Sequence, residues 1–230
     1  MAKHIKRPGT LQIIGESLIT AGIILLLYVV WQLFINDPVV SNNQQHLSKQ
    51  YANEQTQVMK QFADQTKNLK QGKVFAKLYV PRFGKDYERV IGQGTFQKIT
   101  LNVVGVGHYL SSEWPGQTGN FAVAAHRTSH GAPFSNIDKL TAGDKVWVET
   151  NDNWFTYEYR QTKIVDPSDV GVIQNVPVGL SNANKSGYYM TMTSCHPKWS
   201  NRQRIVVWLE LVNTQPKGLG KPQDLIEAQK

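Results

Sequence analysis

The chain has 230 residues, a formal net charge of +8, 40% hydrophobic residues and a single cysteine. One cysteine excludes an internal disulfide, and this length suits one domain with accessory segments or two small domains. The Lys and Arg residues are scattered, and there is no basic helix, zinc finger or RNA-binding aromatic motif, so we do not predict nucleic-acid binding. A basic domain facing an anionic cell envelope accounts for the charge equally well.

The first element is an apolar segment that follows basic residues. Lys3, Lys6 and Arg7 precede it, and residues 17–35 carry no charge. About 20 helical residues span the ~30 Å hydrocarbon layer of a membrane. Positive residues favour the cytoplasmic side, so we predict a single-pass anchor over residues 11–36, with residues 1–10 in the cytoplasm and the rest outside. The alternative is a cleaved signal peptide, but the segment is long for one and no small-x-small site follows it closely.

Residues 37–73 form a polar connector. Asp37 and Pro38 break the anchor helix, and five apolar side chains then recur at steps of four and seven, which places them on one side of a helix. The pattern predicts a helical stalk whose apolar side packs on the following domain or pairs with a second chain. These five residues are Leu47, Tyr51, Val58, Phe62 and Leu69.

From residue 74 to residue 212, short runs of strand-forming residues alternate with turn signals. Residues 151–153 (Asn-Asp-Asn) predict a hairpin turn, and residues 132–140 a short helix. Residues 213–230, rich in Pro, Gly, Lys and Gln, are expected to form a flexible tail. Many short strands and few helices predict a mainly β domain, a closed or partly open barrel. The expected strands are 76–81, 99–104, 120–125, 144–149, 154–160, 163–165, 188–193 and 205–211.

The only cysteine lies at the end of a predicted strand. Pro197 cannot donate to a sheet ladder, so the strand that carries Cys195 ends there, and Arg204 opens the next apolar run. A hairpin of this kind places Cys195 and Arg204 near each other. A buried cysteine acting as a small hydrophobe is the alternative, but the polar neighbours Ser194 and His196 favour a chemical role.

A second polar segment follows the predicted strand at 120–125. His126 stands at the strand end, before a polar loop, and is well placed for proton transfer. The alternative is a histidine that merely caps a turn. Arg127 and His130 are expected to stabilise the loop.

Two other histidines compete for the same acid–base role. They are His108 and His196. An extended chain directs the side chain of His196 away from that of Cys195, its neighbour, which favours His126.

Three separated motifs resemble the sortases, which are membrane-anchored cysteine transpeptidases of Gram-positive bacteria. The motifs are AHRTSHGAPF at 125–134, TMTSCHP at 191–197 and an arginine nine positions after the cysteine. The segments LYVPRFG at 78–84 and GHY at 107–109 look most like class E, the actinobacterial type. The resemblance covers residues 74–212 and implies the eight-stranded sortase β-barrel with short helices, preceded by the anchor and stalk.

The resemblance also implies roles for individual residues. Cys195 would be the nucleophile, His126 the general acid and base, and Arg204 the donor to the oxyanion or a substrate carbonyl. Tyr109 looks like a tyrosine that class E sortases hold near the substrate groove. Ser194 occupies a position where the family usually has threonine, and it keeps the hydroxyl. The resemblance implies that Tyr109 and Ser194 bind the substrate.

A second arginine, Arg202, lies close to Arg204. Alternation along an extended chain would put both on the same side, so the choice of Arg204 rests on the motif.

The implied reaction is cleavage of an LPxTG- or LAxTG-like sorting signal between Thr and Gly. The Thr carboxyl is then joined to an amine of a peptidoglycan precursor, which anchors a surface protein in the cell wall. The implied partners are surface proteins with a C-terminal signal, the precursor amine and the cell membrane. No cofactor is expected, and no metal, because the loop 111–119 offers only Glu113 as a ligand.

Three alternatives were weighed. A pilin-polymerising class C sortase often has an Asp-Pro-aromatic lid, but Asp37-Pro38 lies against the membrane and Asp166-Pro167 lies inside the domain. A non-catalytic envelope scaffold or binding module does not require Cys, His and Arg together. A cell-wall L,D-transpeptidase usually has a Ser-His-Gly-Cys segment, whereas here Ala132 follows Ser-His-Gly.

Overall fold

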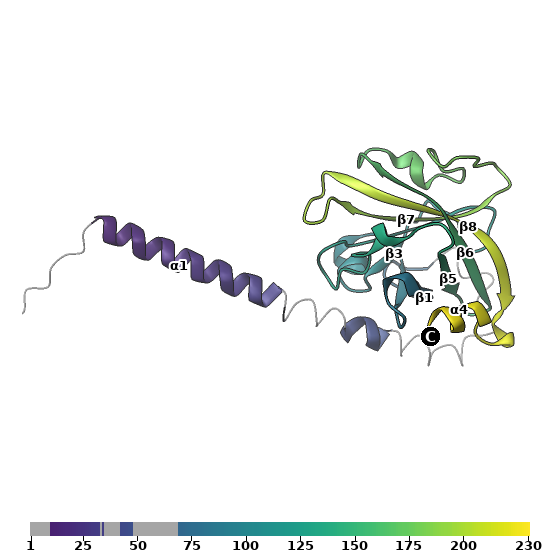
Figure 1. Ribbon diagram of the computed structural model, residues 1–230, viewed down its shortest axis with the longest axis horizontal. Helices are drawn as coiled ribbons and strands as arrows, with labels where there is room; N and C mark the ends of the chain where they lie inside the picture. The colour runs from purple at the N-terminus through teal and green to yellow at the C-terminus, as the bar shows by residue number, and fades with distance from the viewer. Residues whose placement is uncertain (1–9, 33, 35–41, 48–68) are drawn as a thin grey trace, which may run out of the picture.

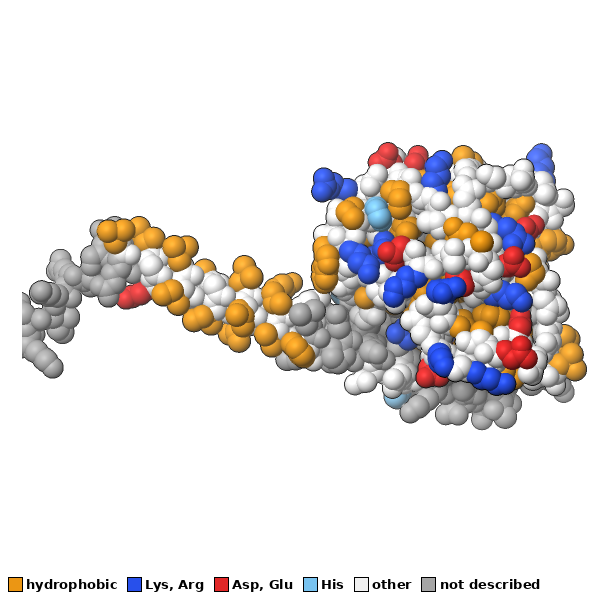
Figure 2. Space-filling model, in the orientation of Figure 1, with side chains coloured by type: hydrophobic (Ala, Val, Ile, Leu, Met, Phe, Trp, Pro, Cys, Tyr) orange, Lys and Arg blue, Asp and Glu red, His pale blue; other side chains and the backbone are white. Residues whose placement is uncertain are grey.

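A computed structural model describes residues 10–32, 34, 42–47 and 69–230. Its first element is the helix α1 (Thr10–Trp31), which projects away from the rest of the molecule (Figure 1). Residues 14–31 of α1 form a strongly apolar window, none of which is buried in the protein. Figure 2 shows hydrophobic side chains along the length of this helix. By length and composition α1 is suited to crossing a bilayer.

Within the described residues, eight strands form one closed barrel in the order β1-β2-β3-β4-β7-β8-β6-β5. The pairs β2–β3 and β4–β7 are parallel, and the other pairs are antiparallel. The prediction of a mainly β, eight-stranded barrel is therefore confirmed. The strands are β1 (Val74–Tyr79), β2 (Glu88–Gln93), β3 (Val106–His108), β4 (Gly119–Ala125), β5 (Lys145–Glu149), β6 (Asn153–Val165), β7 (Tyr188–His196) and β8 (Gln203–Pro216).

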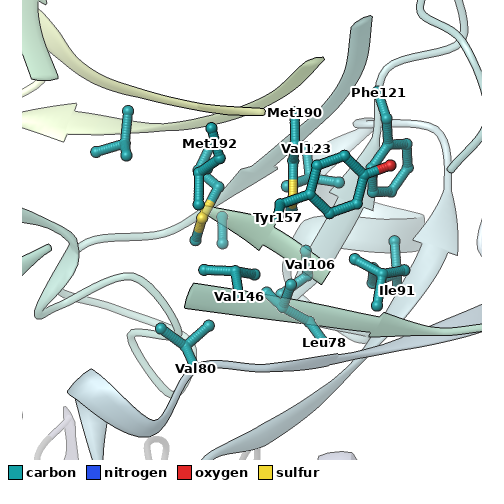
Figure 3. Packing of buried hydrophobic residues seen from close by; sticks show 14 of the residues in the cluster. Leu78, Val80, Ile91, Val106, Phe121, Val123, Val146, Tyr157, Met190 and Met192 are labelled. Carbon is teal, nitrogen blue, oxygen red and sulfur yellow. The ribbon is translucent and has the colours of Figure 1, made fainter. Parts of the chain in front are cut away.

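Alternating side chains fill the interior of the barrel. On β7, Met190 and Met192 point inward and are fully buried, in contact with the hydrophobic core (Figure 3). Since neighbouring residues of a strand face opposite sides of the sheet, Thr191, Thr193 and Cys195 belong to its outer side. The chemistry-bearing side chain of β7 is thus kept out of the apolar core by strand geometry.

The strands between residues 88 and 108 differ from the prediction. Neither β2 nor β3 was expected, and the predicted strand at 99–104 is instead a helical turn, η4 (Gln97–Leu101), followed by turn residues. In β3, a Cβ added to Gly107 would lie 2.4 Å from the carbonyl oxygen of Gly94. The close approach requires glycine, which weakens the strand signal in the sequence.

Two other predicted segments also changed. The expected strands at 154–160 and 163–165 form the single strand β6, which contains two register shifts against β8. The expected helix at 132–140 is a series of turns with one short helical turn, η5 (Ile137–Lys139). A register shift adds or skips a residue within one strand and so disturbs the alternation that a sequence pattern relies on.

The expectation of a flexible tail at 213–230 is wrong. Strand β8 continues to Pro216, and a short helix α4 (Gln223–Ala228) closes the chain. Leu225 of α4 is fully buried against Trp147 and Trp154. The neighbouring Asp224 accepts a hydrogen bond from the indole of Trp147 at 3.2 Å. The tail therefore helps to bury two indoles of the barrel, which its polar composition does not reveal.

Part of the predicted stalk contacts the barrel. Residues 42–47 are helical, and in this piece Gln44 is buried and accepts a hydrogen bond from the backbone N–H of Val90 at 3.1 Å. The side-chain amide of Asn43 donates to the carbonyl of Val103 at 2.9 Å. Leu69 packs against the core. The apolar stripe between residues 48 and 68 lies outside the described residues.

Candidate active site

The β7–β8 hairpin places the cysteine opposite an arginine. In the antiparallel register Cys195 faces Arg204 and His196 faces Gln203. Strand β7 ends at His196, immediately before Pro197. The predicted proximity of Cys195 and Arg204 is confirmed. The thiol is free and half-buried.

The parallel pairing of β4 with β7 brings His126 to the same end of the barrel. Ala124 pairs with Thr193, so His126 and Cys195 each lie two residues further along neighbouring strands. Side chains two residues apart in an extended chain point to the same face of a sheet, so His126 and Cys195 lie on the same face as the paired residues Ala124 and Thr193. Both residues line one cavity of about 860 Å³, together with residues of the loop after β4 and of the β7–β8 loop. Two of the three predicted catalytic residues thus share a solvent-accessible cavity.

His126 is held by a polar contact and by a neighbouring ring. Its Nε2 lies 2.8 Å from Oδ1 of Asn102, and its ring stacks on that of His130 at a centroid distance of 4.8 Å. Burial first, and positive charge on His130 second, lower the pKa of His126 from 6.5 to about 4. At neutral pH the imidazole is therefore neutral. Bonding to the Asn102 oxygen requires the hydrogen on Nε2, which leaves Nδ1 as the proton acceptor.

Asn102 was missed by sequence reasoning. It lies just after η4, in the segment that was expected to be a strand. No local pattern marks an asparagine as a partner of a histidine 24 positions away, because only the folding of η4 over the end of β4 brings them together.

Arg204 and Arg202 have different environments. Arg204 is half-buried, and its Nη1 donates to the carbonyls of Asn201 at 2.8 Å and Gln203 at 2.9 Å. These contacts hold the guanidinium at the end of the hairpin. Arg202 precedes β8, in the bend of the loop, and is exposed. Only Arg204 occupies a strand position paired with Cys195, so the register separates two arginines that alternation alone left equivalent.

Arg127 links the histidine loop to the cysteine. It is 3% exposed, and its Nη1 donates to the carbonyl of Cys195 at 3.3 Å. Its Nη2 pairs with Asp138 at 3.0 Å, and its Nε donates to the carbonyl of Ser135 at 3.4 Å. The expected loop-stabilising role of Arg127 agrees with these contacts. Its direct bond to the backbone of Cys195 was not foreseen.

The two implied substrate-binding residues lie in different surroundings. The hydroxyl of Tyr109 is 3.0 Å from that of Thr193, on the outer side of β7, and the tyrosine is half-buried. Ser194 is 4% exposed and donates to the carbonyl of Ala125 at 2.7 Å. Because that hydroxyl is buried and already bonded between β4 and β7, its geometry does not support contact with a substrate. We therefore assign Ser194 to the joining of these two strands.

The competing histidines do not reach the cavity. Both ring nitrogens of His108 are bonded: Nδ1 to Gln93 at 2.7 Å, and Nε2 to the hydroxyl of Ser112 and the carbonyl of Glu113, each at 3.0 Å. His108 is 1% exposed. His196 points to the other side of its strand, where Nδ1 lies 3.5 Å from Nη1 of Arg127. These contacts leave His126 as the histidine that lines the cavity with Cys195.

Metal ligands do not gather at this site. Among the residues that the structure describes, no group of three or more His, Cys, Asp or Glu could hold a metal ion. Glu113, the acidic residue of loop 111–119, accepts a hydrogen bond from the side chain of Asn175 at 2.8 Å.

Comparison with known proteins agrees with this geometry. A model of the sortase domain matches residues 78–212. The chain is 33% identical to sortase SrtE1 of Streptomyces coelicolor over 96% of its own length and 64% of that protein, and 33% identical to sortase SrtE2 of the same organism over 91% and 87%. The chain thus spans slightly less than two thirds of SrtE1.

Solved structures give a similar result. Sortase E from Streptomyces avermitilis is 39% identical and superimposes with a TM-score of 0.62, covering 68% of this chain and 99% of the other. Sortase E1 from S. coelicolor, solved with a tripeptide in its active site, is 34% identical with a TM-score of 0.64, covering 67% and 97%.

Proposed function

Since this chain belongs to the sortase family of cysteine transpeptidases, we propose that it cleaves a sorting signal of the LPxTG or LAxTG kind between Thr and Gly and transfers the Thr carboxyl to an amine of a peptidoglycan precursor. The observation that carries the proposal is the shared cavity of Cys195 and His126, with Arg204 directly opposite the cysteine. The substrates would be surface proteins that end in such a signal.

The proposed reaction begins at the thiol. Cys195 Sγ attacks the carbonyl carbon of the Thr–Gly amide, and its proton passes to the neutral imidazole of His126. The protonated imidazole gives this proton to the nitrogen of the leaving glycine, so the C–N bond breaks and a thioester remains on Cys195. The acceptor amine then attacks the thioester and loses a proton to His126. The C–S bond breaks to leave an amide, and the protonated imidazole returns its proton to the departing sulfur, which restores the thiol.

His126 enters this sequence of proton transfers as the neutral imidazole. Its pKa of about 4 means that the imidazole starts as a base at neutral pH and becomes an acid only after it has received the proton of the thiol. The contact of Nε2 with Asn102 fixes the ring and leaves Nδ1 as the acceptor. We therefore propose Asn102 as the residue that orients the acid–base group.

The two guanidinium groups have separate proposed roles. Arg204 donates to the tetrahedral oxyanion or to a substrate carbonyl, where a charge-assisted hydrogen bond strengthens as negative charge develops. Nε and Nη2 of Arg204 have no hydrogen-bond partner in the described part of the chain, so they remain free for this purpose. Arg127 is buried and bonded, and it positions the backbone of Cys195.

We also propose that α1 anchors the enzyme in the cell membrane, with the N-terminus in the cytoplasm and the barrel outside. The support is the apolar window of α1 and the basic residues Lys3, Lys6 and Arg7 before it. Protease added to intact protoplasts is expected to digest the barrel, and full protection of the barrel would contradict this orientation.

Mass spectrometry of the enzyme–substrate adduct tests the proposed chemistry. Incubation with LPxTG and LAxTG peptides is expected to give a thioacyl adduct on Cys195 that carries the peptide up to Thr, and an added amine is expected to release it as an amide. Cys195→Ala is the matched control and should give neither adduct nor product with an unchanged circular dichroism spectrum. Cleavage by that variant, or cleavage at another peptide bond, would contradict the proposal.

A further inference from the structure

The tip of the β7–β8 loop carries an aromatic side chain that the barrel does not bury. Trp199 is 77% exposed and has a φ of 67°, in the left-handed region that bulky residues rarely adopt. In the barrel, Trp147, Trp154 and Trp208 are at most 5% exposed, and Trp114 is half-buried against the core. No packing within the described chain explains why a large indole is held outward at this position.

The same loop lies beside the outer end of α1. Trp199 lines the cavity of Cys195 together with Tyr28, Val29 and Gln32 of α1. Figure 1 shows the β7–β8 hairpin on the side of the barrel from which α1 projects. The end of α1 also carries Trp31, which is 48% exposed. Tyr and Trp concentrate at the two interfaces of a membrane, so Trp199 lies next to aromatic residues at the level expected for the outer interface.

The charged residues of the β7–β8 loop also favour contact with a membrane surface. Residues 170–209 contain no Asp or Glu, and Lys198 and Arg202 are exposed on either side of Trp199. The β5–β6 turn, which contains the exposed Asp152, lies at the other end of β6 from Val165, the residue that pairs with Arg204. At ~3.3 Å per residue, β6 separates these two ends by roughly 35–40 Å. The tip of the β7–β8 hairpin is therefore basic, which favours contact with an anionic surface, while the exposed Asp166 and Asp169 follow the end of β6 that pairs with Arg204.

We propose that the β7–β8 loop binds the outer surface of the membrane, with Trp199 in the headgroup layer and Lys198 and Arg202 against anionic phospholipids. The inference rests on the proposed membrane span of α1 and goes beyond it, because a single helix fixes no orientation of the barrel. The opening of the cavity with Cys195 then faces the bilayer, and a substrate tethered to the membrane reaches the thiol along the bilayer surface.

Spin labelling of the full chain in vesicles of phosphatidylglycerol and phosphatidylcholine tests this orientation. All variants carry Cys195→Ser, so that one introduced cysteine takes the nitroxide: Ser200→Cys beside Trp199, or Asp152→Cys as the control at the opposite end. Vesicle flotation first establishes that each protein is membrane-bound. Relaxation by oxygen, which concentrates in the membrane, is then compared with relaxation by a water-soluble nickel chelate.

The label at position 200 is expected to be several-fold less accessible to nickel than the label at position 152, and more accessible to oxygen. Trp199→Ala, and separately Lys198→Gln with Arg202→Gln, should shift the values at position 200 toward those of the control.

Four results would overturn the proposal. The first is equal accessibility at both positions in floating vesicles, and the second is protection that appears only when a sorting-signal peptide is added, which would assign the loop to the peptide. The third is protection that depends on the protein-to-lipid ratio, which would assign the loop to a second copy, and the fourth is failure of the protein to float with the vesicles. The last result alone also removes the proposed span, and the chemistry proposed for Cys195 stands in every case.

Discussion

Two histidines of the barrel have lowered pKa values: His108, which is fully buried, and the partly buried His126, which alone faces the site. Burial brings the pKa of His108 and of His126 to about 4 in each case. His108 is surrounded by the rings of Phe75, Trp114 and Phe121. Both of its nitrogens are bonded within the protein. His126 has one bonded nitrogen, one stacked ring and an open side toward a cavity.

This difference shows that a shifted pKa does not by itself identify an acid–base residue. The same desolvation acts on a structural histidine that joins three segments of chain and on one poised beside a thiol. Within the described residues one nitrogen of His126 has no hydrogen-bond partner, and this difference and the shared cavity separate the two roles. The expected effects of mutations therefore divide: changes at His126 should alter turnover, and changes at His108 should alter folding.

The largest effect is expected from His126→Ala. Loss of a general acid and base typically costs 10²–10⁴-fold in rate, so kcat/KM on a sorting-signal peptide should fall by about 10³-fold. The melting temperature should change little, because His126 lies at the edge of a cavity. Steady-state kinetics and calorimetry on the same preparation measure both. Retention of most activity would return the acid–base role to His108 or His196.

His108→Ala should give the opposite pattern. The variant loses its bonds to Gln93 and Glu113 and leaves a cavity between aromatic rings, which together should lower the free energy of unfolding by about 2–4 kcal/mol. Denaturant unfolding measures the loss. Activity per folded molecule, determined below the melting temperature, should stay within a few-fold of the parent. A loss of turnover without a loss of stability would refute the structural role.

The pH dependence of stability should reflect both His108 and His126. A pKa of about 4 in the folded chain against 6.5 in the unfolded chain means that the unfolded state binds more protons between these values. The free energy of unfolding should therefore decrease as the pH falls from 6.5 to 4 and should level off below pH 4. The contribution of His108 reaches about 3 kcal/mol, and His108→Gln should remove it. His126→Gln should remove a contribution of similar size, because its pKa is lowered to about the same value; an unchanged pH dependence in both variants would contradict these pKa values.

Arg204→Lys should reduce kcat/KM by at least about tenfold despite its retained charge. A guanidinium presents a planar fork of donors, whereas an ammonium is a point charge on a flexible stem, and loss of one oxyanion donor costs about 10²–10³-fold at its full value. Arg202→Lys is the matched control and should be much milder, because Arg202 lies outside β8. A larger loss of kcat/KM in Arg202→Lys would assign the oxyanion-binding role to Arg202. Normal activity in both variants would mean that backbone amides bind the oxyanion.

The smallest effect is expected from Tyr109→Phe. The variant loses one hydrogen bond to Thr193 and keeps the aromatic ring. Loss of such a bond costs about 1 kcal/mol, which corresponds to a decrease of roughly fivefold in kcat/KM. If Tyr109 borders the bound peptide, the change should appear in KM more than in kcat. Thr193→Val removes the same bond from the other side and should resemble it. A double variant that behaves like either single one would assign the effect to this bond.

The sequence by itself determined the elements whose signal is local. Alternating strand formers that end at Pro197 fixed the position of Cys195, and the spacing to Arg204 fixed the hairpin that pairs them. Three motifs, around His126, Cys195 and Arg204, together supplied the family and cover the three proposed catalytic residues. In α1 an uncharged apolar run was sufficient, because helix formation in a membrane depends on composition and length.

Only the tertiary structure decided the contacts between distant segments. Asn102 reaches His126 because residues 97–101 form a helical turn instead of a strand, and β3 became a strand through a glycine that allows close packing. Arg127 contacts Cys195 across 68 positions of sequence, and Leu225 turns an apparently loose tail into a cover for two indoles. These choices depend on burial and on close approach between segments, and neither quantity is encoded in the periodicity of a single segment.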